Sequence, residues 1–589
     1  MQAPGPGAPP YITFRHLKRL LTCQPYFVWH PRPTPLEVDN EAEEFSFWQI
    51  AFDDELPPSY AALVKSGYTK VVQFFVDYIQ IQANQLGRKV LVINNHHPLS
   101  AWHQTRAALD DPAVDWIVNP VFISEDLLVK SALYRKEVAQ VSALVHSTKT
   151  KLNNYIQAYF ETKVLDRLGV PLQNYSFFTY DNQSSYPVAP ALKFSESIYC
   201  WTQKAGPSRT TKVSVAAQAG GPILSKVRSG RIVDARGPRA AVGLPQAFEW
   251  YIDQIRAART QTTRPLVISA ADLTPWGENP HFNTLVPFAQ LQLPPISGSL
   301  VKKRELLQLL HHEVDLATLA RQKRSLKLIL AATNVVDYAK LRVALQPFQT
   351  QVCTWYDFEG FAMPFVILAH TKPHQQLVFQ VSVIQTRAGQ LDRSTNLVFD
   401  PQHLSHRDFQ ALVDAIYDPT TTYYVVYNQS YETTRLREIR DQILYHHLSP
   451  AEYQIYAHKI NHIIDHTFDL LDWFKISGSK TTLPPLVLHQ LHGFSSIKKL
   501  EDLITQSQLE LPVMIKPYKT LVVQNGLMAM NKAIQRYLGT IGDREWAALA
   551  TDLRAYCEND VRAMIMVYHF VAWIVANETN PAWATVLRL

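Results

Sequence analysis

The amino-acid sequence predicts a mixed α/β fold divided among more than one domain. The chain has 589 residues, which is more than one ordinary hydrophobic core contains. Hydrophobic residues make up 47% of the chain and charged residues 18%, as is usual in globular proteins. Short apolar stretches of strand length alternate with amphipathic stretches of helical period. This alternation favours sheets with helices packed on their faces.

Residues 1–202 are expected to form the first α/β domain. Apolar residues at helical spacing predict one helix over 69–87 and another over 153–170, which end at Gly87 and Gly169. Three apolar stretches between these helices predict strands over 115–123, 126–134 and 138–147.

The composition changes in the next segment, residues 203–245. This segment is rich in Gly, Ser and Pro, and its eight Lys and Arg residues face a single acid, Asp234. We expect a basic loop or linker. It is either a solvated connection between domains or a strip that contacts nucleic-acid phosphates without sequence preference. For the second interpretation the candidate residues are Lys226, Arg228 and Arg231.

Residues 246–345 are predicted to be a mainly helical connecting region, and residues 346–589 a second α/β domain. In the second domain three strands come first, and helices then alternate with strands up to a long C-terminal helix. The apolar run 564–577 in that helix is shorter than the roughly 20 residues that cross a bilayer. We therefore expect a buried helix there and no membrane association.

Two carboxylates stand out at the start of the second α/β domain. Residues 348–355 are apolar, aromatic and β-branched, and they predict a buried strand that leads into Asp357 and Glu359. Side chains two positions apart on a strand point to the same side of the sheet. Because burial of unpaired carboxylates is unfavourable, a common partner is expected where these two side chains point.

Further polar and acidic residues follow at corresponding positions of later elements. Asn428 ends an apolar strand, and Glu432 lies on the first turn of the helix that follows. Asp469 precedes an apolar helical face. Tyr556 and Asp560 are four positions apart in a strongly periodic helix, so they share one face of it.

This series of motifs resembles the DnaQ-like, DEDD-type 3′–5′ exonucleases, which have an RNase H-like fold. The stretches "FDLLDWF" and "FSSIKKLEDL" also resemble motifs of that group, and Lys498 in the second stretch is a possible accessory residue. The closer resemblance, over about residues 330–575, is to an uncharacterised bacterial family. That family joins a RecB-like N-terminal half to an exonuclease half of this kind.

The resemblance implies hydrolysis of phosphodiester bonds in DNA or RNA with two Mg²⁺ or Mn²⁺ ions. It implies that the metal ligands are Asp357, Glu359, Glu432 and Asp560. Asp357 would bridge both ions. Glu359 would also orient or help to activate the attacking water. Tyr556, one helical turn from Asp560, would hydrogen-bond that water.

The second motif departs from the family pattern, which has Asp where this chain has Glu432. The longer Glu432 side chain is compatible with a metal ligand on a slightly retracted helix. It is equally compatible with altered or lost activity. Two further residues are possible accessory residues with structural alternatives. Asn428 is also suited to capping the following helix, and Asp469 to stabilising a helix N-terminus.

The N-terminal half resembles RecB- and Cas4-like nucleases of the PD-(D/E)XK group in its opening helix, "FRHLKRLLTCQPYF", and in its strand pattern. Ser131, Leu144 and His146 stand where that group has Asp, Glu and Lys, and this set does not form a metal site. We expect a degenerate, restriction-endonuclease-like domain retained for structure or for nucleic-acid contact. Lys149 and Lys151 suit such contact, unless they lie on a plain solvated edge.

Other motifs point away from further cofactors. The four cysteines are far apart, so we expect neither an iron–sulfur cluster nor a thiolate zinc site. The chain contains no Gly-x-x-x-x-Gly-Lys-Ser/Thr loop, so no nucleotide cofactor is expected, and none of its adjacent His pairs has the His-Glu-x-x-His spacing. No signal-peptide pattern opens the sequence, and we expect a cytoplasmic protein.

We therefore expect a metal-dependent 3′–5′ exonuclease whose partner is DNA or RNA. The net charge of +6 is compatible with such a partner, and the sequence indicates no particular protein partner. The alternative is a catalytically decayed nucleic-acid-binding or scaffold protein that retains both nuclease folds. Glu432 and the substitutions in the N-terminal half favour this alternative, whereas Asp357, Glu359, Tyr556 and Asp560 favour the enzyme.

Overall fold

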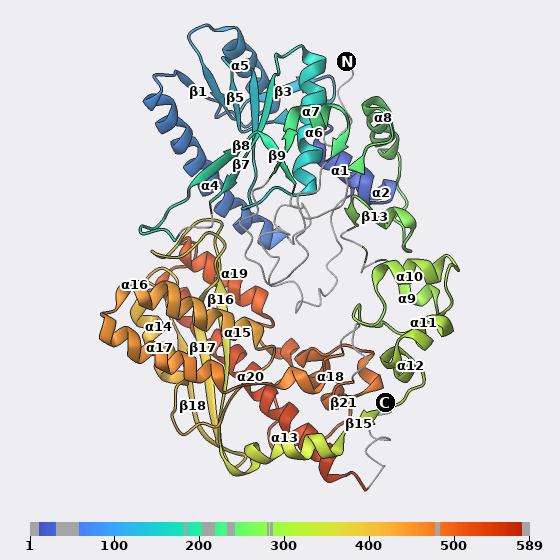
Figure 1. Cartoon of the computed structure of the whole chain (residues 1–589), viewed down its shortest axis with the longest axis vertical. Coiled ribbons are helices and arrows are strands. Elements are labelled where there is room, and N and C mark those ends of the chain that lie inside the picture. Colours follow the sequence, from blue (N-terminus) through green and yellow to red (C-terminus); the bar gives the residue numbers. More distant parts are fainter. Residues whose placement is uncertain are drawn as a thin grey trace.

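A computed structural model describes residues 11–30, 58–181, 185–202, 218–232, 242–279, 282, 285, 287–476 and 483–579. Two mixed sheets, each with its own helices, form the N-terminal and C-terminal halves of this α/β protein. The sheet of the N-terminal half lies at the top of Figure 1 and that of the C-terminal half at the bottom, with the short helices α9–α12 along one side. No helix in the described part of the chain is long and apolar enough to cross a membrane.

The N-terminal sheet has six strands in the order β1-β2-β5-β6-β7-β8, and β3 and β4 form a separate hairpin. Their bounds are β1 Val90–Val92, β2 Trp116–Val118, β3 Val121–Ser124, β4 Leu127–Lys130, β5 Leu133–Arg135, β6 Gln140–Leu144, β7 Asn174–Tyr180 and β8 Phe194–Ser197. The stretches 115–123 and 126–134, each predicted as one strand, are therefore two strands each. The first is interrupted at Asn119, which has a φ of 56° and precedes Pro120, a residue that cannot donate to a ladder.

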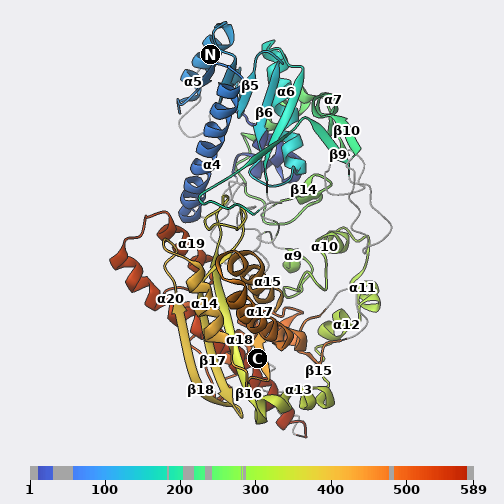
Figure 2. The ribbon, with the colours of Figure 1, turned by 60° about the vertical axis from the view of Figure 1, so that its left-hand side comes forward.

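Helices cover this sheet and lie beside it (Figures 1 and 2). They are α1 Phe14–Thr22, α2 Pro25–Trp29, α4 Pro58–Gln85, α5 Pro98–Asp110, α6 Leu152–Leu168 and α7 Ile223–Arg228. The predicted ends of two helices are confirmed, since α4 and α6 stop just before Gly87 and Gly169, both with a φ of 66°. Glycine adopts this left-handed conformation without a steric penalty.

The structure differs from the expected loop within the basic segment. Residues 218–232 contain β10 (Gln218–Pro222), helix α7 and β11 (Arg231–Ile232), and Ile223, Leu224 and Val227 of α7 belong to the N-terminal core. Strand β12 (Val242–Gly243) pairs with β11, and residues 203–217 and 233–241 lie outside the described residues.

The candidate phosphate contacts of this segment have different surroundings. Arg228 donates to Asp166 Oδ1 at 2.7 Å and to the Leu172 carbonyl at 3.2 Å. Lys226 is partly exposed and Arg231 is exposed. Apolar residues at the spacing of a short helix therefore fold part of the segment onto α6, and one of its three candidate cations is paired within the protein.

Helices are the main regular elements of residues 246–345 in the described part of the chain. The elements of this region are α8 Phe248–Ala258, α9 Pro287–Gln290, α10 Lys303–Leu310, α11 Leu316–Gln322 and α12 Arg324–Leu330, with the short strands β13 Leu273–Thr274, β14 Gly277–Glu278 and β15 Val335–Val336. The hairpin of β13 and β14 was not predicted. Strand β15 pairs with β21 (Leu486–Val487) and so joins this region to the C-terminal half.

The C-terminal sheet has five strands in the order β18-β17-β16-β19-β20. Strands β16, β17 and β18 are antiparallel to one another, whereas β19 is parallel to β16 and β20 is parallel to β19. Their bounds are β16 Val352–Phe361, β17 Leu377–Arg387, β18 Gln390–Val398, β19 Tyr423–Val426 and β20 Thr467–Asp469. The predicted strand 348–355 therefore begins later and continues through both carboxylates, because helix α13 (Tyr338–Thr350) extends into its first residues.

The remaining helices of this half pack on the two faces of the sheet. They are α14 His406–Ile416, α15 Ser430–Glu438, α16 Tyr445–His447, α17 Pro450–Asp465, α18 Ile497–Gln506, α19 Gly526–Tyr537 and α20 Asp543–Ala576. Alternation along β16 separates two cores. Tyr356 and Phe358 pack in the core that contains α14, whereas Cys353 and Trp355 pack in the core that contains the second half of α20.

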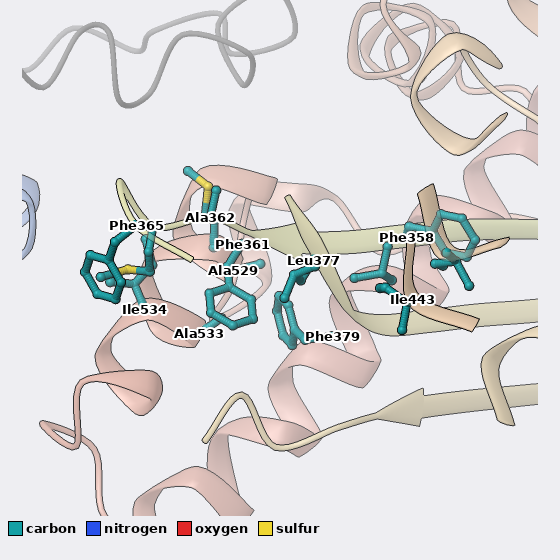
Figure 3. Close-up of a cluster of buried hydrophobic side chains, with 14 of the residues drawn as sticks. Phe358, Phe361, Ala362, Phe365, Leu377, Phe379, Ile443, Ala529, Ala533 and Ile534 are labelled. Atoms are coloured by element: carbon teal, nitrogen blue, oxygen red, sulfur yellow. The ribbon is translucent and has the colours of Figure 1, made fainter. Parts of the chain in front are cut away.

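Figure 3 shows the part of the core at the end of β16. Phe358 lies beside Ile443, whereas Phe361 and Phe365 lie beside the α19 residues Ala529, Ala533 and Ile534. The same core continues into the N-terminal half through Val71 and Phe75 of α4. A backbone bridge between Ala191 and Val366 also joins the halves. The carboxyl end of β16 thus lies where the two halves of the molecule meet.

Candidate metal centre

Two acidic residues interrupt an otherwise apolar face of strand β16. Trp355 on this face is buried with its ring 5.9 Å from that of Tyr568 of α20, and Phe361 lies 6.0 Å from the ring of Tyr537 of α19. Asp357 and Glu359 occupy the two positions between them on the same face. Glu359 is buried, with 6% of its surface exposed, and Asp357 is half-buried. Strand periodicity therefore puts both carboxylates on one face of β16, and the tertiary structure packs this face against helix α20.

Helix α20 supplies the third carboxylate. Its Cys557 lies next to the strand, with Sγ 3.7 Å from the Asp357 carbonyl oxygen and 3.9 Å from Asp357 Oδ2. Asp560, three positions later, belongs to the same side of the helix. Carboxylate oxygens of Asp357, Glu359 and Asp560 all lie within 4.8 Å of one another. In the part of the chain that the structure describes, no other three His, Cys, Asp or Glu side chains converge in this way.

Two tyrosines and a lysine surround the Asp560 carboxylate. Tyr518, in the short 3-10 turn Tyr518–Thr520, donates to Asp560 Oδ1 at 2.5 Å, and Tyr556 also hydrogen-bonds this carboxylate. Burial raises the pKa of Asp560, whereas the bond from Tyr518, the charge of Lys498 and the bond from Tyr556 oppose that rise. Lys498 Nζ lies 5.3 Å from the centre of the Tyr518 ring.

The chemistry of this donor set fits a hard divalent cation. Three carboxylates offer oxygen ligands only, which is the preference of Mg²⁺ and Mn²⁺. Their close approach is unfavourable without a cation, because each charge opposes ionisation of its neighbours. Burial, together with the same charges, raises the pKa of the adjacent Cys557 thiol well above its usual value.

Glu432 lies outside this group of three carboxylates. It is buried on the first turn of α15, near Tyr356, and its charge contributes to the raised pKa of Tyr356, which is mainly caused by burial. Tyr356 and Asp357 are consecutive on β16 and point to opposite faces. The assignment of Glu432 as a ligand therefore stays a prediction.

The turn that leads into α15 is held by Asp469. The Asp469 carboxylate accepts bonds from three backbone N–H groups: Asn428 at 2.8 Å, Gln429 at 3.0 Å and Leu471 at 3.0 Å. Asn428 itself has a φ of 75° and accepts a bond from Ser430 Oγ at 2.9 Å. Both residues shape the loop after β19, and neither is among the three converging carboxylates.

The three N-terminal residues compared with nuclease ligands in the sequence lie in a different environment. Ser131 lies between β4 and β5 and donates to Glu161 Oε2 at 3.1 Å, while Leu144 ends β6. His146 follows, with its Nδ1 3.1 Å from the Tyr180 hydroxyl. Lys149 is exposed, and Lys151 is the partly exposed N-cap residue of α6.

Sequence reasoning missed two residues that the structure places at these sites. Tyr518 is separated from Asp560 by 42 positions, and its only sequence signal is its place in the family-like stretch "YKTLVVQNGLMAMNKAIQRY". Glu161 gave no signal, because an acid in an amphipathic helix is ordinarily exposed. Only the packing of α6 on the N-terminal sheet makes it a buried carboxylate.

Comparison with known proteins identifies similar proteins without a described activity. Residues 354–496 match a domain of unknown function, DUF2779. The matched part contains Asp357, Glu359 and Glu432 but ends before Asp560. No solved structure matches the chain.

The curated relatives are uncharacterised proteins of mycoplasmas. The chain is 35% identical over 227 residues to uncharacterized protein UU173 of Ureaplasma parvum, and 36% identical over 223 residues to uncharacterized protein MG366 of Mycoplasma genitalium. These alignments cover 38% and 37% of this chain and 31% of each relative. The chain thus spans about a third of the length of the curated relatives it matches. Together, the matches indicate an uncharacterised family.

Proposed function

We propose that the protein is a metal-dependent 3′–5′ exonuclease that hydrolyses phosphodiester bonds of DNA or RNA. The observation that carries this proposal is the convergence of Asp357, Glu359 and Asp560 within 4.8 Å from a strand and a helix that are 200 positions apart. Structural packing does not require three carboxylates in one half-buried place. A cation-dependent reaction explains why they are there.

Each residue has a defined role in the proposed reaction. Two Mg²⁺ or Mn²⁺ ions would supply Lewis acidity at the phosphoryl group and a nucleophilic water. Asp357, Glu359 and Asp560 would hold these ions, Asp357 as the shared ligand, and Glu359 would orient the attacking water. Tyr556 would hydrogen-bond that water from its place one turn before Asp560.

The topology of the C-terminal half supports an RNase H-like assignment for this proposal. Its central strand β16 carries the first acidic pair, two antiparallel strands lie on one side, and two parallel strands lie on the other. For the N-terminal half we propose a restriction-endonuclease-like sheet without a metal site. Ser131 there contacts a buried glutamate, and Leu144 offers no ligand atom.

Two further proposals concern substrate contact and compartment. Lys498 lies beside the carboxylate group and is suited to a substrate phosphate near the ions. Lys149, Lys151 and the exposed Arg231 are candidates for more remote phosphate contacts. All four cysteines are free and buried, which fits the reducing cytoplasm.

A degradation assay tests the function directly. End-labelled single-stranded and double-stranded DNA and RNA are incubated with the full-length protein and either Mg²⁺, Mn²⁺ or a chelator. We expect stepwise shortening from the 3′ end only when metal is present. Asp357→Ala removes the shared ligand and is expected to reduce the rate by more than about 100-fold. This is a larger loss than is expected when only a hydrogen-bond partner of a metal ligand is removed. If the first labelled product of a 5′-labelled substrate is the mononucleotide, degradation starts at the 5′ end, which would contradict the 3′–5′ direction.

A non-catalytic scaffold is the second candidate. It is favoured by the position of Glu432 outside the carboxylate group and by the Ser131 and Leu144 substitutions. It predicts that wild type and Asp357→Ala bind nucleic acid equally, degrade none of the substrates and respond to metal in the same way. That set of results would replace the nuclease proposal.

A further inference from the structure

Tyr518 contacts the carboxylate group from a segment with no recognised role. Its ring is buried, and its hydroxyl donates to Asp560 Oδ1 at 2.5 Å. Burial raises the pKa of Tyr518 well above its usual value, and the nearby carboxylates of Asp560, Asp357 and Glu501 add to this rise. In this contact the phenolic O–H is the donor and the Asp560 carboxylate oxygen is the acceptor.

Asn559 fixes the segment that carries Tyr518 to helix α20. The Lys516 N–H donates to Asn559 Oδ1 at 3.1 Å, and Asn559 Nδ2 donates to the Lys516 carbonyl at 3.0 Å. A side-chain amide that bonds both the N–H and the C=O of one residue permits a single register of this segment against the helix. Tyr518 follows Lys516 by two residues in the segment, and Asp560 directly follows Asn559 in the helix. The buried amide thus determines which hydroxyl meets which carboxylate.

Helix α18 closes this arrangement from the other side. Lys498 and Glu501 are three positions apart on α18, so they lie on neighbouring positions of one face. Lys498 lies over the ring of Tyr518, and Glu501 is buried and bonded to Thr505 Oγ1 at 3.0 Å. Tyr518 is therefore held by its ring as well as by its hydroxyl.

We propose that Tyr518 is a positioning residue that fixes the orientation of the Asp560 carboxylate toward the metal ions. This inference rests on the proposed metal-dependent function of the Asp357, Glu359 and Asp560 group. The Asp560 side chain has two rotatable bonds, so its carboxylate has several accessible orientations unless a neighbour fixes one of them. A buried donor to Oδ1 removes that freedom before metal arrives, as outer hydrogen bonds do for metal ligands in general.

Metal dependence is the measurement that isolates this role. Full-length wild type and Tyr518→Phe are compared for hydrolysis of end-labelled DNA, and separately for Mn²⁺-induced thermal stabilisation without nucleic acid, each over a range of Mn²⁺ concentration. Tyr518→Phe is expected to raise the Mn²⁺ concentration for half-maximal effect by about 10- to 100-fold in both measurements. Saturating Mn²⁺ is expected to restore most of the rate.

Tyr134→Phe is the matched control. The Tyr134 hydroxyl is also buried and donates to the Pro171 carbonyl at 2.8 Å, but it lies in the N-terminal half. Its loss should leave the Mn²⁺ requirement unchanged. Should Tyr518→Phe not fold, Asn559→Ala, which releases the segment and keeps the hydroxyl, is expected to raise the Mn²⁺ requirement in the same direction.

Each result decides one of the two proposals. A folded Tyr518→Phe with the wild-type Mn²⁺ requirement overturns the positioning role and leaves the nuclease intact. A rate loss that saturating Mn²⁺ does not restore also overturns it. A wild type that gains thermal stability with Mn²⁺ but degrades no substrate ends the nuclease proposal, and the thermal measurement still tests Tyr518. A wild type that responds to Mn²⁺ in neither way overturns both.

Discussion

The two halves of the molecule each bury acidic side chains against a mixed sheet, but they do so in opposite ways. In the N-terminal half, Glu161 accepts bonds from Ser131 at 3.1 Å, Tyr175 at 2.8 Å and Gln157 at 2.7 Å. In the C-terminal half, three carboxylates face one another within 4.8 Å. Glu161 faces donors alone, whereas each carboxylate of the C-terminal group also faces two other acids, even though Asp560 accepts bonds from two tyrosines.

This difference separates a structural carboxylate from a candidate functional one. Burial raises the pKa of Glu161 to about 7, and its three hydrogen bonds only partly oppose that rise. Protonation is thus enough to make Glu161 compatible with its site. Three mutually repelling carboxylates are instead best stabilised by a divalent cation. The buried polar residues of the N-terminal sheet are therefore satisfied by one another, whereas the acids of β16 and α20 form a candidate cation site.

The largest effect is expected from the pH dependence of Glu161. Its folded-state pKa of about 7 lies above the ordinary value of 4.5, so the folded protein binds this proton more tightly. The resulting stability is fully present below about pH 4.5 and is lost as the pH rises through 7, a change of up to about 3 kcal/mol. Glu161→Gln keeps the shape and removes the titration. Chemical denaturation at pH 5 and pH 8 should show a smaller pH-dependent loss in Glu161→Gln than in the wild type; equal losses would mean that Glu161 is charged in the folded protein.

A slightly smaller effect is expected from metal at the C-terminal group. A cation bound only by the folded state should stabilise the wild type by about 2.7 kcal/mol at a concentration one hundred times its Kd. Asp357→Ala should gain much less, while its stability without metal should hold or rise, because one of three repelling charges is gone.

Glu545→Ala is the control for this thermal measurement. Glu545 is an exposed acid on the first turn of the same helix α20, away from Asp560. Its replacement should leave the metal-induced shift of the melting temperature unchanged. Equal shifts in wild type and Asp357→Ala would place the metal elsewhere and remove the contrast between the halves.

Glu432→Gln should have an intermediate effect on activity. Because Glu432 lies outside the converging carboxylates, its neutral isostere should lower kcat/KM by about tenfold, as expected for a residue that acts on a metal ligand indirectly. The measurement is the initial rate of end-labelled substrate shortening. A loss as complete as that of Asp357→Ala would show that Glu432 becomes a direct ligand when metal and substrate are bound.

The smallest effect is expected at Asp469. Asp469→Asn retains one acceptor oxygen and loses the charged partner of the Gln429 N–H, which should lower the free energy of unfolding by about 1 kcal/mol. The Mn²⁺ requirement should not change, because Asp469 holds a loop and is outside the carboxylate group. Metal titration and denaturation of the same preparation test both parts, and a changed Mn²⁺ requirement would restore Asp469 as an accessory residue.

Local patterns predicted much of the architecture. The ends of α4 and α6 at glycines, the three-strand start of the C-terminal domain and the long final helix all follow from periodicity and from turn residues. The division of 115–123 into two strands did not, because an apolar run has no periodicity that reveals a turn at Asn119. Helix α7 was missed because the surrounding basic, Gly-rich composition obscured three apolar positions.

The sequence by itself determined which side chains lie on the same face of one strand or helix. Asp357 and Glu359 share a face because strands repeat every two residues, and Tyr556 and Asp560 share one because helices repeat every 3.6. Only the tertiary structure decided which faces meet: that β16 turns its acids toward α20, that Glu432 stays with Tyr356 and that Tyr518 reaches Asp560. These contacts join residues tens to hundreds of positions apart. They depend on how whole apolar faces pack against one another, which local periodicity in the sequence does not reveal.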